Sequence, residues 1–248
     1  MNYNASDYVF KAPPVISRAR RVLIKPAVSY AAPYPVTTSP GIISQIIQGI
    51  RQVSDADILI LGGTPTGAPI QPVYQKLGYD FPRVLMLDIK DSIWVEVDNP
   101  LTKPLIVPTF WIPNVILSSD YLISVSPMQV IQGRPYLSMM NLVTVLPAAK
   151  YGNGSRGGWE DLFALGMDKV MADLYFTLPF DLAIIEGRQE FISQGDPARG
   201  DVKDFGRMFV GEPYQVDLEA SQALGIKAEY LASIDEARKD LEGSGSII

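Results

Sequence analysis

Short apolar runs and amphipathic segments of helical spacing alternate along the chain. The clearest apolar runs, which we interpret as strands, are RVLIK (21–25), DILIL (57–61), RVLMLDI (83–89), SIWVEVD (92–98) and DLAIIEG (181–187). Between the first two runs, Ser39 and Pro40 supply an N-cap and a first-turn proline for a helix that extends to about Arg51. Strands that alternate with helices in this way predict an α/β fold, a three-layer sandwich in which a mostly parallel sheet has helices on both faces.

Turn and cap signals organise the rest of the chain. Further helices are expected near residues 71–77, 159–178 and 213–224, and helix and strand signals recur at 110–125. Ser233 and Glu236 have the spacing of a capping box for a C-terminal helix, while the glycines and aspartates of residues 188–206 predict a long loop. Because no repeat or clean linker divides the sequence, we expect an N-terminal arm over residues 1–19 and a single α/β domain over residues 20–248.

The chain contains neither histidine nor cysteine. Because these residues supply thiol nucleophiles, Ser–His pairs and the usual ligands of zinc and iron–sulfur clusters, the sequence predicts no iron–sulfur cluster and no zinc. Mg²⁺ and Ca²⁺ take oxygen ligands and remain compatible with the aspartates and glutamates. Without histidine, we also expect the stability of the protein to change little between about pH 6 and 8.

The formal net charge is -6, whereas nucleic acids and anionic membrane surfaces normally require a basic face. The most apolar region, residues 104–127, is interrupted by prolines and by Asp120, so it lacks the roughly 20 consecutive apolar residues of a membrane span. The N-terminus has no basic start followed by an apolar run, and no secretory signal is expected. We therefore expect a cytoplasmic protein without nucleic-acid or membrane partners, and a homo-oligomer stays open.

Several segments, taken in order, resemble a known family. They are VLIKPAVSY with the downstream TTSPGIISQIIQGI, the segment DILILGGTPTG, the pair SDYLISVSP and NLVTVLPAAKYG, and the C-terminal run that begins LAIIEGRQEF and ends ASQALG. This order is similar to the prokaryotic family called domain of unknown function 362, over roughly residues 20–240. The resemblance implies an α/β fold and candidate site positions, but no particular reaction.

The chain departs from the family pattern at two basic stretches. Gln129, Val130 and Ile131 stand where the family usually has Lys-Thr-His, and Met140-Asn141 stands where it has Lys-Asn. If the basic residues bind anions or take part in catalysis in relatives, this chain lacks them. The resemblance nevertheless makes Asn141 a candidate ligand-binding residue.

The loop GGTPTG (62–67) follows a predicted strand and precedes a predicted helix. Backbone amides freed by glycine and the positive end of a helix favour phosphate or carboxylate binding, which makes Gly62, Gly63, Thr64 and Thr66 candidate ligand-binding residues. The loop is neither G-x-G-x-x-G nor a Walker P-loop, because no Lys-Ser or Lys-Thr follows it. A tight crossover turn is the alternative interpretation.

Two lysines are candidates for contact with an anion. Lys25 ends the first strand, at the edge where open α/β sheets bind ligands, and it could neutralise an anion or act as a base when desolvated. Alternatively, it reaches solvent past the strand end. Lys150 begins KYGNGSRGG (150–158), which could close over an anion as a lid or simply be mobile. Tyr30 and Tyr34 could line a pocket wall or pack at an edge.

Three carboxylates belong to the C-terminal run. Glu186 ends a strand, Asp196 precedes Pro197 in the expected loop, and Asp217 lies on the following helix. If they converge, they could bind Mg²⁺ or Ca²⁺ or supply an acid–base pair. Glu186 and Asp217 are therefore candidate catalytic residues together with Lys25, and all three carboxylates are candidate metal ligands. Capping and turn chemistry are the alternatives, above all for Asp196.

These candidates favour an enzyme that acts on a small anionic metabolite at the carboxyl edge of the sheet. The alternative is a non-catalytic ligand-binding or assembly protein that kept the family fold and lost its basic site residues. The two hypotheses differ in one geometric requirement, because the enzyme needs Lys25 and Glu186 to face a common pocket.

Overall fold

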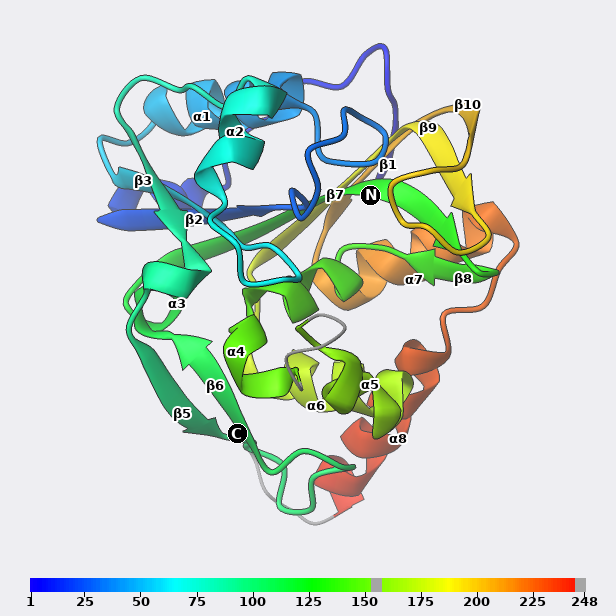
Figure 1. Ribbon diagram of the computed structural model, residues 1–248. Helices are drawn as coiled ribbons and strands as arrows, with labels where there is room; N and C mark the ends of the chain where they lie inside the picture. The colour runs from blue at the N-terminus through cyan, green and yellow to red at the C-terminus, as the bar shows by residue number, and fades with distance from the viewer. Residues whose placement is uncertain (153–157, 244–248) are drawn as a thin grey trace.

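The strands of the computed structural model, which describes residues 1–152 and 158–243, form two sheets. The larger sheet contains β1 (Asn2–Asn4), β2 (Arg21–Pro26), β3 (Asp57–Gly62), β4 (Val84–Asp88), β7 (Tyr121–Ile131), β8 (Arg134–Tyr136), β9 (Leu182–Ser193) and β10 (Asp201–Gly211). Within the described residues its order is β1-β10-β9-β7-β2-β3-β4, and β8 pairs with β7. The pairs among β2, β3, β4, β7 and β9 are parallel, while β1, β8 and β10 pair antiparallel. The fold is therefore α/β with a mostly parallel mixed sheet, as the sequence predicts (Figure 1).

Two helices cover one face of this sheet, namely α1 (Pro40–Arg51) and α2 (Gln71–Leu77). The Ser39 side chain caps α1 by accepting a hydrogen bond from the Ile42 amide, and Gly78 ends α2 with φ 72°, a left-handed conformation that glycine adopts without strain. The isoleucines of α1 share a core with alternate residues of β2, Val22 and Ile24. The predicted helix boundaries are confirmed here.

The opposite face carries a larger set of helices. They are the 3₁₀ helix η3 (Met140–Val145), α4 (Ala148–Tyr151), α5 (Glu160–Ala164), α6 (Met167–Thr177), α7 (Pro213–Leu224) and α8 (Glu229–Gly243). Leu23 of β2 belongs to the core on this side, together with Leu142 of η3 and Leu174 of α6. Because strand side chains alternate between faces, Leu23 belongs to this core while its neighbours Val22 and Ile24 belong to the core under α1. Figure 1 shows the two sets of helices on opposite sides of the sheet.

The expected long loop at residues 188–206 is wrong. β9 continues to Ser193 and pairs antiparallel with β10, so most of this segment is a β-hairpin. The first half of β10 is exposed, which gives the strand the polar composition of a loop. Gly206, with φ 81°, lies where the pairing register shifts between Asp204 and Arg207, so one glycine that suggested a loop marks a β-bulge.

Other expectations also differ in detail. Ser233 lies inside α8, which begins at Glu229, so the predicted capping box does not start this helix. The helical pattern at 159–178 is divided at Gly166 into α5 and α6. Residues 92–98 do contain a strand, β5 (Trp94–Asp98), but it pairs with β6 (Thr109–Pro113) in a separate two-stranded sheet.

Residues 1–19, expected as an N-terminal arm, lie against the main sheet and its α1 side. β1 pairs with β10, and the side chains of Phe10 and Ile16 are buried in the same core as α1. The remaining short elements are η1 (Pro14–Arg18), η2 (Ile89–Asp91) and α3 (Asn114–Leu117). Among the described helices, none combines the length and the apolar composition needed to cross a bilayer.

The order of the strands changes direction between β2 and β7. From β2, the chain adds β3 and β4 on one side, and it later adds β7 and β9 on the other side. β2 and β7 are adjacent and parallel, with Lys25 aligned to Ser124. In open α/β sheets, the crevice at the carboxyl ends of two such strands is the usual place for a ligand.

Candidate functional site

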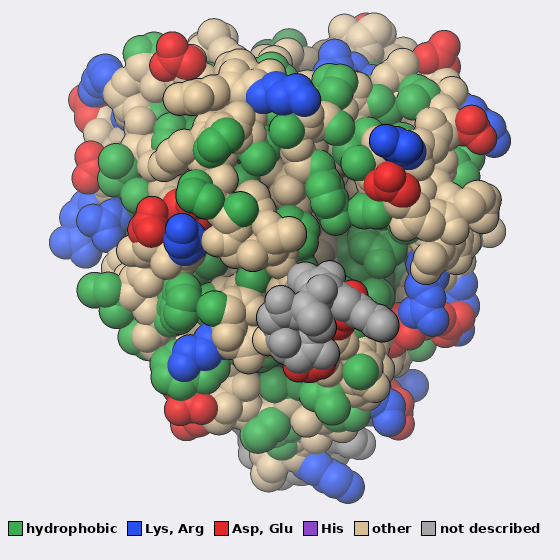
Figure 2. Space-filling model, in the orientation of Figure 1, with side chains coloured by type: hydrophobic (Ala, Val, Ile, Leu, Met, Phe, Trp, Pro, Cys, Tyr) green, Lys and Arg blue, Asp and Glu red, His purple; other side chains and the backbone are tan. Residues whose placement is uncertain are grey.

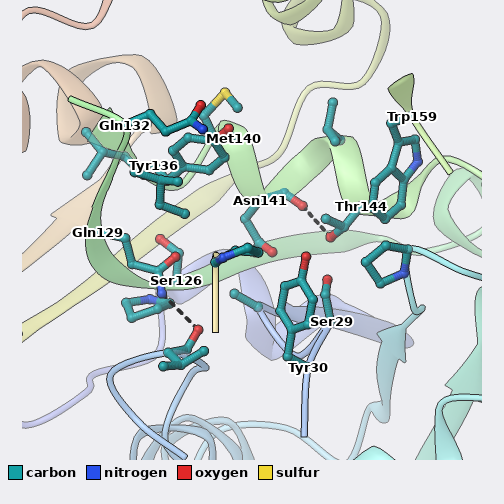
Figure 3. A pocket seen from close by; sticks show the side chains of 18 of the residues that line it. Ser29, Tyr30, Ser126, Gln129, Gln132, Tyr136, Met140, Asn141, Thr144 and Trp159 are labelled. Carbon is teal, nitrogen blue, oxygen red and sulfur yellow. Dashed lines mark hydrogen bonds between the residues drawn. The ribbon is translucent and has the colours of Figure 1, made fainter. Parts of the chain in front are cut away.

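A cavity of about 260 Å³ opens at the carboxyl ends of β2 and β7. Its walls come from the segment after β2, from β7 and β8, from η3, and from the β9–β10 turn, so distant parts of the sequence meet there. The polar side chains of its lining, grouped around the cavity in Figure 3, are Ser29, Tyr30, Ser126, Gln129, Gln132, Tyr136, Asn141 and Thr144. The cavity therefore occupies the position at which α/β folds place their ligands.

Ser126 is a buried polar residue in the wall of this cavity. Its side chain is only 2% exposed, and its Oγ has no hydrogen-bond partner among the described residues. Ser124, two residues earlier on the same strand, donates from its Oγ to the Ser138 carbonyl oxygen at 2.9 Å. A buried hydroxyl without a partner loses its hydration and gains nothing in return, so Ser126 is a place where a ligand would supply the missing hydrogen bond.

Two predicted site residues are brought together here: Asn141 in the cavity wall and Lys25, which does not line the cavity. Lys25 Nζ donates to Asn141 Oδ1 at 3.1 Å and to the Pro26 carbonyl oxygen at 2.8 Å, and the Lys25 side chain is buried. The Asn141 amide donates in turn to the Lys25 carbonyl oxygen and to Ser124 Oγ. Burial lowers the pKa of Lys25 to about 7, so the amine is largely uncharged above neutral pH. The interpretation that Lys25 reaches solvent is wrong.

The predicted anion-binding loop lies beside a second hollow of about 690 Å³, lined by Gly63, Thr64 and Thr66 among others. The carboxylate of Asp88 lies at the start of α2 and accepts a hydrogen bond from the Ile70 amide at 2.9 Å. The protein thus places its own anion at this helix start. Gly62 does not line the hollow; a Cβ there would collide with the Tyr74 hydroxyl, so close packing explains this glycine.

Glu186 lies on the opposite face of the sheet from Lys25. Its buried carboxylate accepts hydrogen bonds from the Ser39 amide at 3.0 Å and from Ser39 Oγ at 2.6 Å, and it pairs with Arg188. These contacts place Glu186 at the N-terminus of α1, where a negative charge is stabilised by the helix dipole. Lys25 instead contacts Asn141 on the η3 side, so the two residues do not face a common pocket.

Asp217 and Asp196 are held in two further places. The buried Asp217 carboxylate accepts from the Ser138 and Met139 amides, from Ser138 Oγ and from the Tyr230 hydroxyl. Burial raises its pKa to about 6. Asp196 lies in the β9–β10 turn and pairs with Arg199 at 3.6 Å.

The predicted carboxylate metal site is not formed in the described part of the chain. No group of three or more Asp, Glu, His or Cys side chains there has the geometry to hold a metal ion. Glu186, Asp196 and Asp217 are each occupied by separate partners, as described above. The prediction that these three carboxylates form a Mg²⁺ or Ca²⁺ site is therefore wrong. Their order in the sequence suggested that they converge, but strand alternation and helix placement direct their side chains apart.

The remaining candidates are Lys150 with its predicted lid, Tyr30 and Tyr34. Lys150 is exposed, with its Nζ 3.7 Å from the centroid of the Trp111 ring. Most of the predicted lid, residues 153–157, lies outside the described residues. Tyr30 lines the cavity as expected, whereas the Tyr34 hydroxyl donates to the Glu186 carbonyl oxygen and accepts from the Gln189 amide.

The comparisons with known proteins bear on the family and on the fold. The sequence pattern of the family described as "Domain of unknown function (DUF362)" matches residues 22–221. The chain belongs to this family. No curated protein matches the chain.

Solved structures show the same fold. A matching one is the lactate racemase apoprotein from Thermoanaerobacterium thermosaccharolyticum, with a TM-score of 0.52, 10% sequence identity and coverage of 88% of this chain. The match covers 52% of the racemase chain, so this protein spans about half the length of that structural relative. At this identity the similarity describes the fold alone.

The structure shows where the residues lie that depart from the DUF362 sequence pattern. Gln129, at a position where the resemblance expects a Lys-Thr-His stretch, donates from Nε2 to the Pro35 and Val36 carbonyl oxygens. Met140, where the resemblance expects lysine, is buried in the cavity wall. Both positions therefore contribute uncharged side chains to the cavity.

Sequence reasoning missed Ser126, Tyr136 and Trp159 as members of the cavity wall. A signal for Ser126 existed, because SVSP places two serines at alternate positions of an otherwise apolar strand. Alternate residues point to the same face, so both serines face η3 and the core beneath it. For Tyr136 and Trp159 no comparable signal existed, since nothing in their local pattern predicts that β8 and the start of α5 meet β7.

Proposed function

We propose that this protein binds a small molecule in the cavity between β2 and β7. The single observation that carries the proposal is Ser126, a buried hydroxyl without a partner at the wall of a cavity that lies where α/β sheets bind ligands. A ligand that accepts from or donates to Ser126 Oγ would supply the hydrogen bond that no described residue makes to this buried hydroxyl.

The geometry supports binding over the two-residue catalytic arrangement expected from the sequence. An enzyme that uses Lys25 and Glu186 together needs both side chains at one pocket. In this structure the two side chains lie on opposite faces of the sheet. The Glu186 carboxylate is also fully engaged by Ser39 and Arg188, so it has a structural role at α1.

A thermal-shift screen of a metabolite library tests the proposed binding, since a ligand of the folded state raises apparent stability by mass action. The screen is run in parallel on wild type and on Ser126→Leu, whose added side-chain atoms enter the cavity. We expect stabilising compounds that lose their effect in Ser126→Leu. Compounds that stabilise both proteins equally, or a complete screen without any stabilising compound, would contradict the proposal. The melting temperature of ligand-free Ser126→Leu confirms that the variant is folded.

A further inference from the structure

We propose that the cavity selects uncharged ring compounds that carry hydroxyl or amide groups, and that it rejects the anionic counterparts of the same compounds. This inference rests on the proposed function, and it names the class of ligand. It differs from the anionic metabolite that the sequence suggests.

The charge of the cavity wall is the first argument. The described residues that line it include no Asp, Glu, Lys or Arg. At the rim, Asp196 pairs with Arg199, so the turn that borders the cavity contributes no net positive charge. In Figure 2, hydrophobic side chains surround a hollow near the middle of the face, and charged side chains of both signs are scattered over the rest of it. An anion would lose its hydration in the cavity without gaining a cationic partner, which is strongly unfavourable.

Lys25 hydrogen bonds to Asn141 of the cavity wall, but it does not itself line the cavity. Its Nζ is directed to Asn141 Oδ1 and to the Pro26 carbonyl oxygen, and it is absent from the lining. The Asn141 amide is equally committed, because it donates to the Lys25 carbonyl oxygen and to Ser124 Oγ. The Asn141 amide donors are therefore used within this network, and Lys25 Nζ does not line the cavity.

The hydroxyl groups of the cavity are the second argument. Ser126 Oγ is buried without a partner, and the hydroxyls of Tyr30 and Tyr136 have no hydrogen bond to any described residue. Burial is the main cause that raises the pKa of both tyrosines, so each stays a neutral phenol at physiological pH. A hydroxyl both donates and accepts, which matches the hydroxyl and amide groups of a neutral ligand.

The shape and the rings of the cavity are the third argument. Tyr30, Tyr136, Trp159 and Phe163 all line it, so a flat ring would find aromatic partners on several sides. The volume of about 260 Å³ corresponds to roughly nine waters at their share of liquid volume. A single substituted ring fits that space.

Matched pairs of probes test the selection by charge. Benzamide is compared with benzoate, and benzyl alcohol with benzyl phosphate, because the ring is the same within each pair. Each probe is titrated into isotope-labelled full-length protein, and amide NMR shifts report both the affinity and the location. We expect the neutral probes to shift cavity residues near Ser126, Tyr30 and Tyr136, with affinities at least tenfold above those of the anionic partners.

The possible outcomes separate this inference from the proposed function. Equal or tighter binding of benzoate and benzyl phosphate at the cavity would overturn the selection by charge and leave the cavity as a ligand site. Absence of binding by every probe would contradict both. If anions bind and Lys25→Met abolishes their binding, the lysine serves as a counterion and the inference is wrong; retention of benzamide binding shows that this variant is folded.

Discussion

Two serines on one strand show how the surroundings of a side chain decide its contribution. Ser124 and Ser126 are both buried, lie two positions apart on β7 and point to the same face. Ser124 connects the Asn141 amide to the Ser138 carbonyl oxygen, while the Ser126 hydroxyl has no partner among the described residues. The first therefore stabilises the fold, and the second is available to a ligand.

This difference predicts opposite effects of the same substitution on stability. Ser124→Ala removes one partner from each of two buried polar groups and should lower the free energy of unfolding by about 1–3 kcal/mol. Ser126→Ala removes a hydroxyl that has no partner, so the free energy of unfolding should stay unchanged or rise by about 1 kcal/mol. Urea denaturation of the ligand-free proteins measures both. Equal destabilisation by the two substitutions would show that Ser126 has a structural partner.

At the scale of elements, the core strands and helices could be predicted because their pattern is local. β2, β3, α1 and α2 follow from apolar runs, an N-cap serine and a closing glycine. The β9–β10 hairpin could not, since the first half of β10 is exposed and its polar composition is that of a loop. The cavity could be placed at the carboxyl edge of the sheet, but its neutral wall depends on how β7, β8 and η3 pack.

Glu186 joins two elements, and its role predicts a selective loss of stability. Glu186→Gln removes the negative charge that Ser39, Arg188 and the N-terminus of α1 share, and it should lower the free energy of unfolding by about 1–3 kcal/mol. Glu190→Gln, on the same strand but only partly buried, is the matched control and should change it by less than about 0.5 kcal/mol. Chemical denaturation compares them, and an equal effect would contradict the capping role.

At the scale of the whole molecule, two buried titratable groups shape the dependence of stability on pH. The pKa of Lys25 is lowered to about 7 and that of Asp217 is raised to about 6, so both values fall near neutrality. The expectation of a flat profile between about pH 6 and 8 was based on the absence of histidine, whereas the burial of Lys25 predicts that stability changes with pH from about pH 7 upward. The burial of Lys25 could not be predicted from the sequence, because a lysine at the end of a predicted strand can equally reach solvent.

The sign of the Lys25 effect follows from proton binding. Between about pH 7 and the ordinary lysine pKa, the unfolded chain holds a proton that the folded protein has released. Stability should therefore rise with pH in that window, by at most about 1.4 kcal/mol per pH unit. Lys25→Met should remove this rise, and the difference between the wild-type and variant profiles isolates it from other groups. Parallel profiles would show that the lysine remains charged in the fold.

Asp217 has the opposite sign. Because its folded pKa of about 6 exceeds the unfolded value of 3.8, the folded protein binds the proton more tightly. Its contribution to stability is therefore present at low pH and decreases as the pH rises from about 4 to 6. The difference between wild type and Asp217→Asn, followed by denaturation across this range, should show that decrease. A difference that grows with pH would mean that the hydrogen-bond donors around the carboxylate outweigh its burial.

Binding at the cavity is tested most directly by the affinity of one ligand for three proteins. The compound that stabilises wild type most in the thermal-shift screen is titrated by calorimetry into wild type, Ser126→Ala and Ser124→Ala. The loss of one ligand hydrogen bond should weaken binding to Ser126→Ala by about tenfold, whereas Ser124→Ala should bind with the wild-type affinity because Ser124 does not line the cavity. Unchanged affinity in Ser126→Ala, or an equal loss in both variants, would contradict the account.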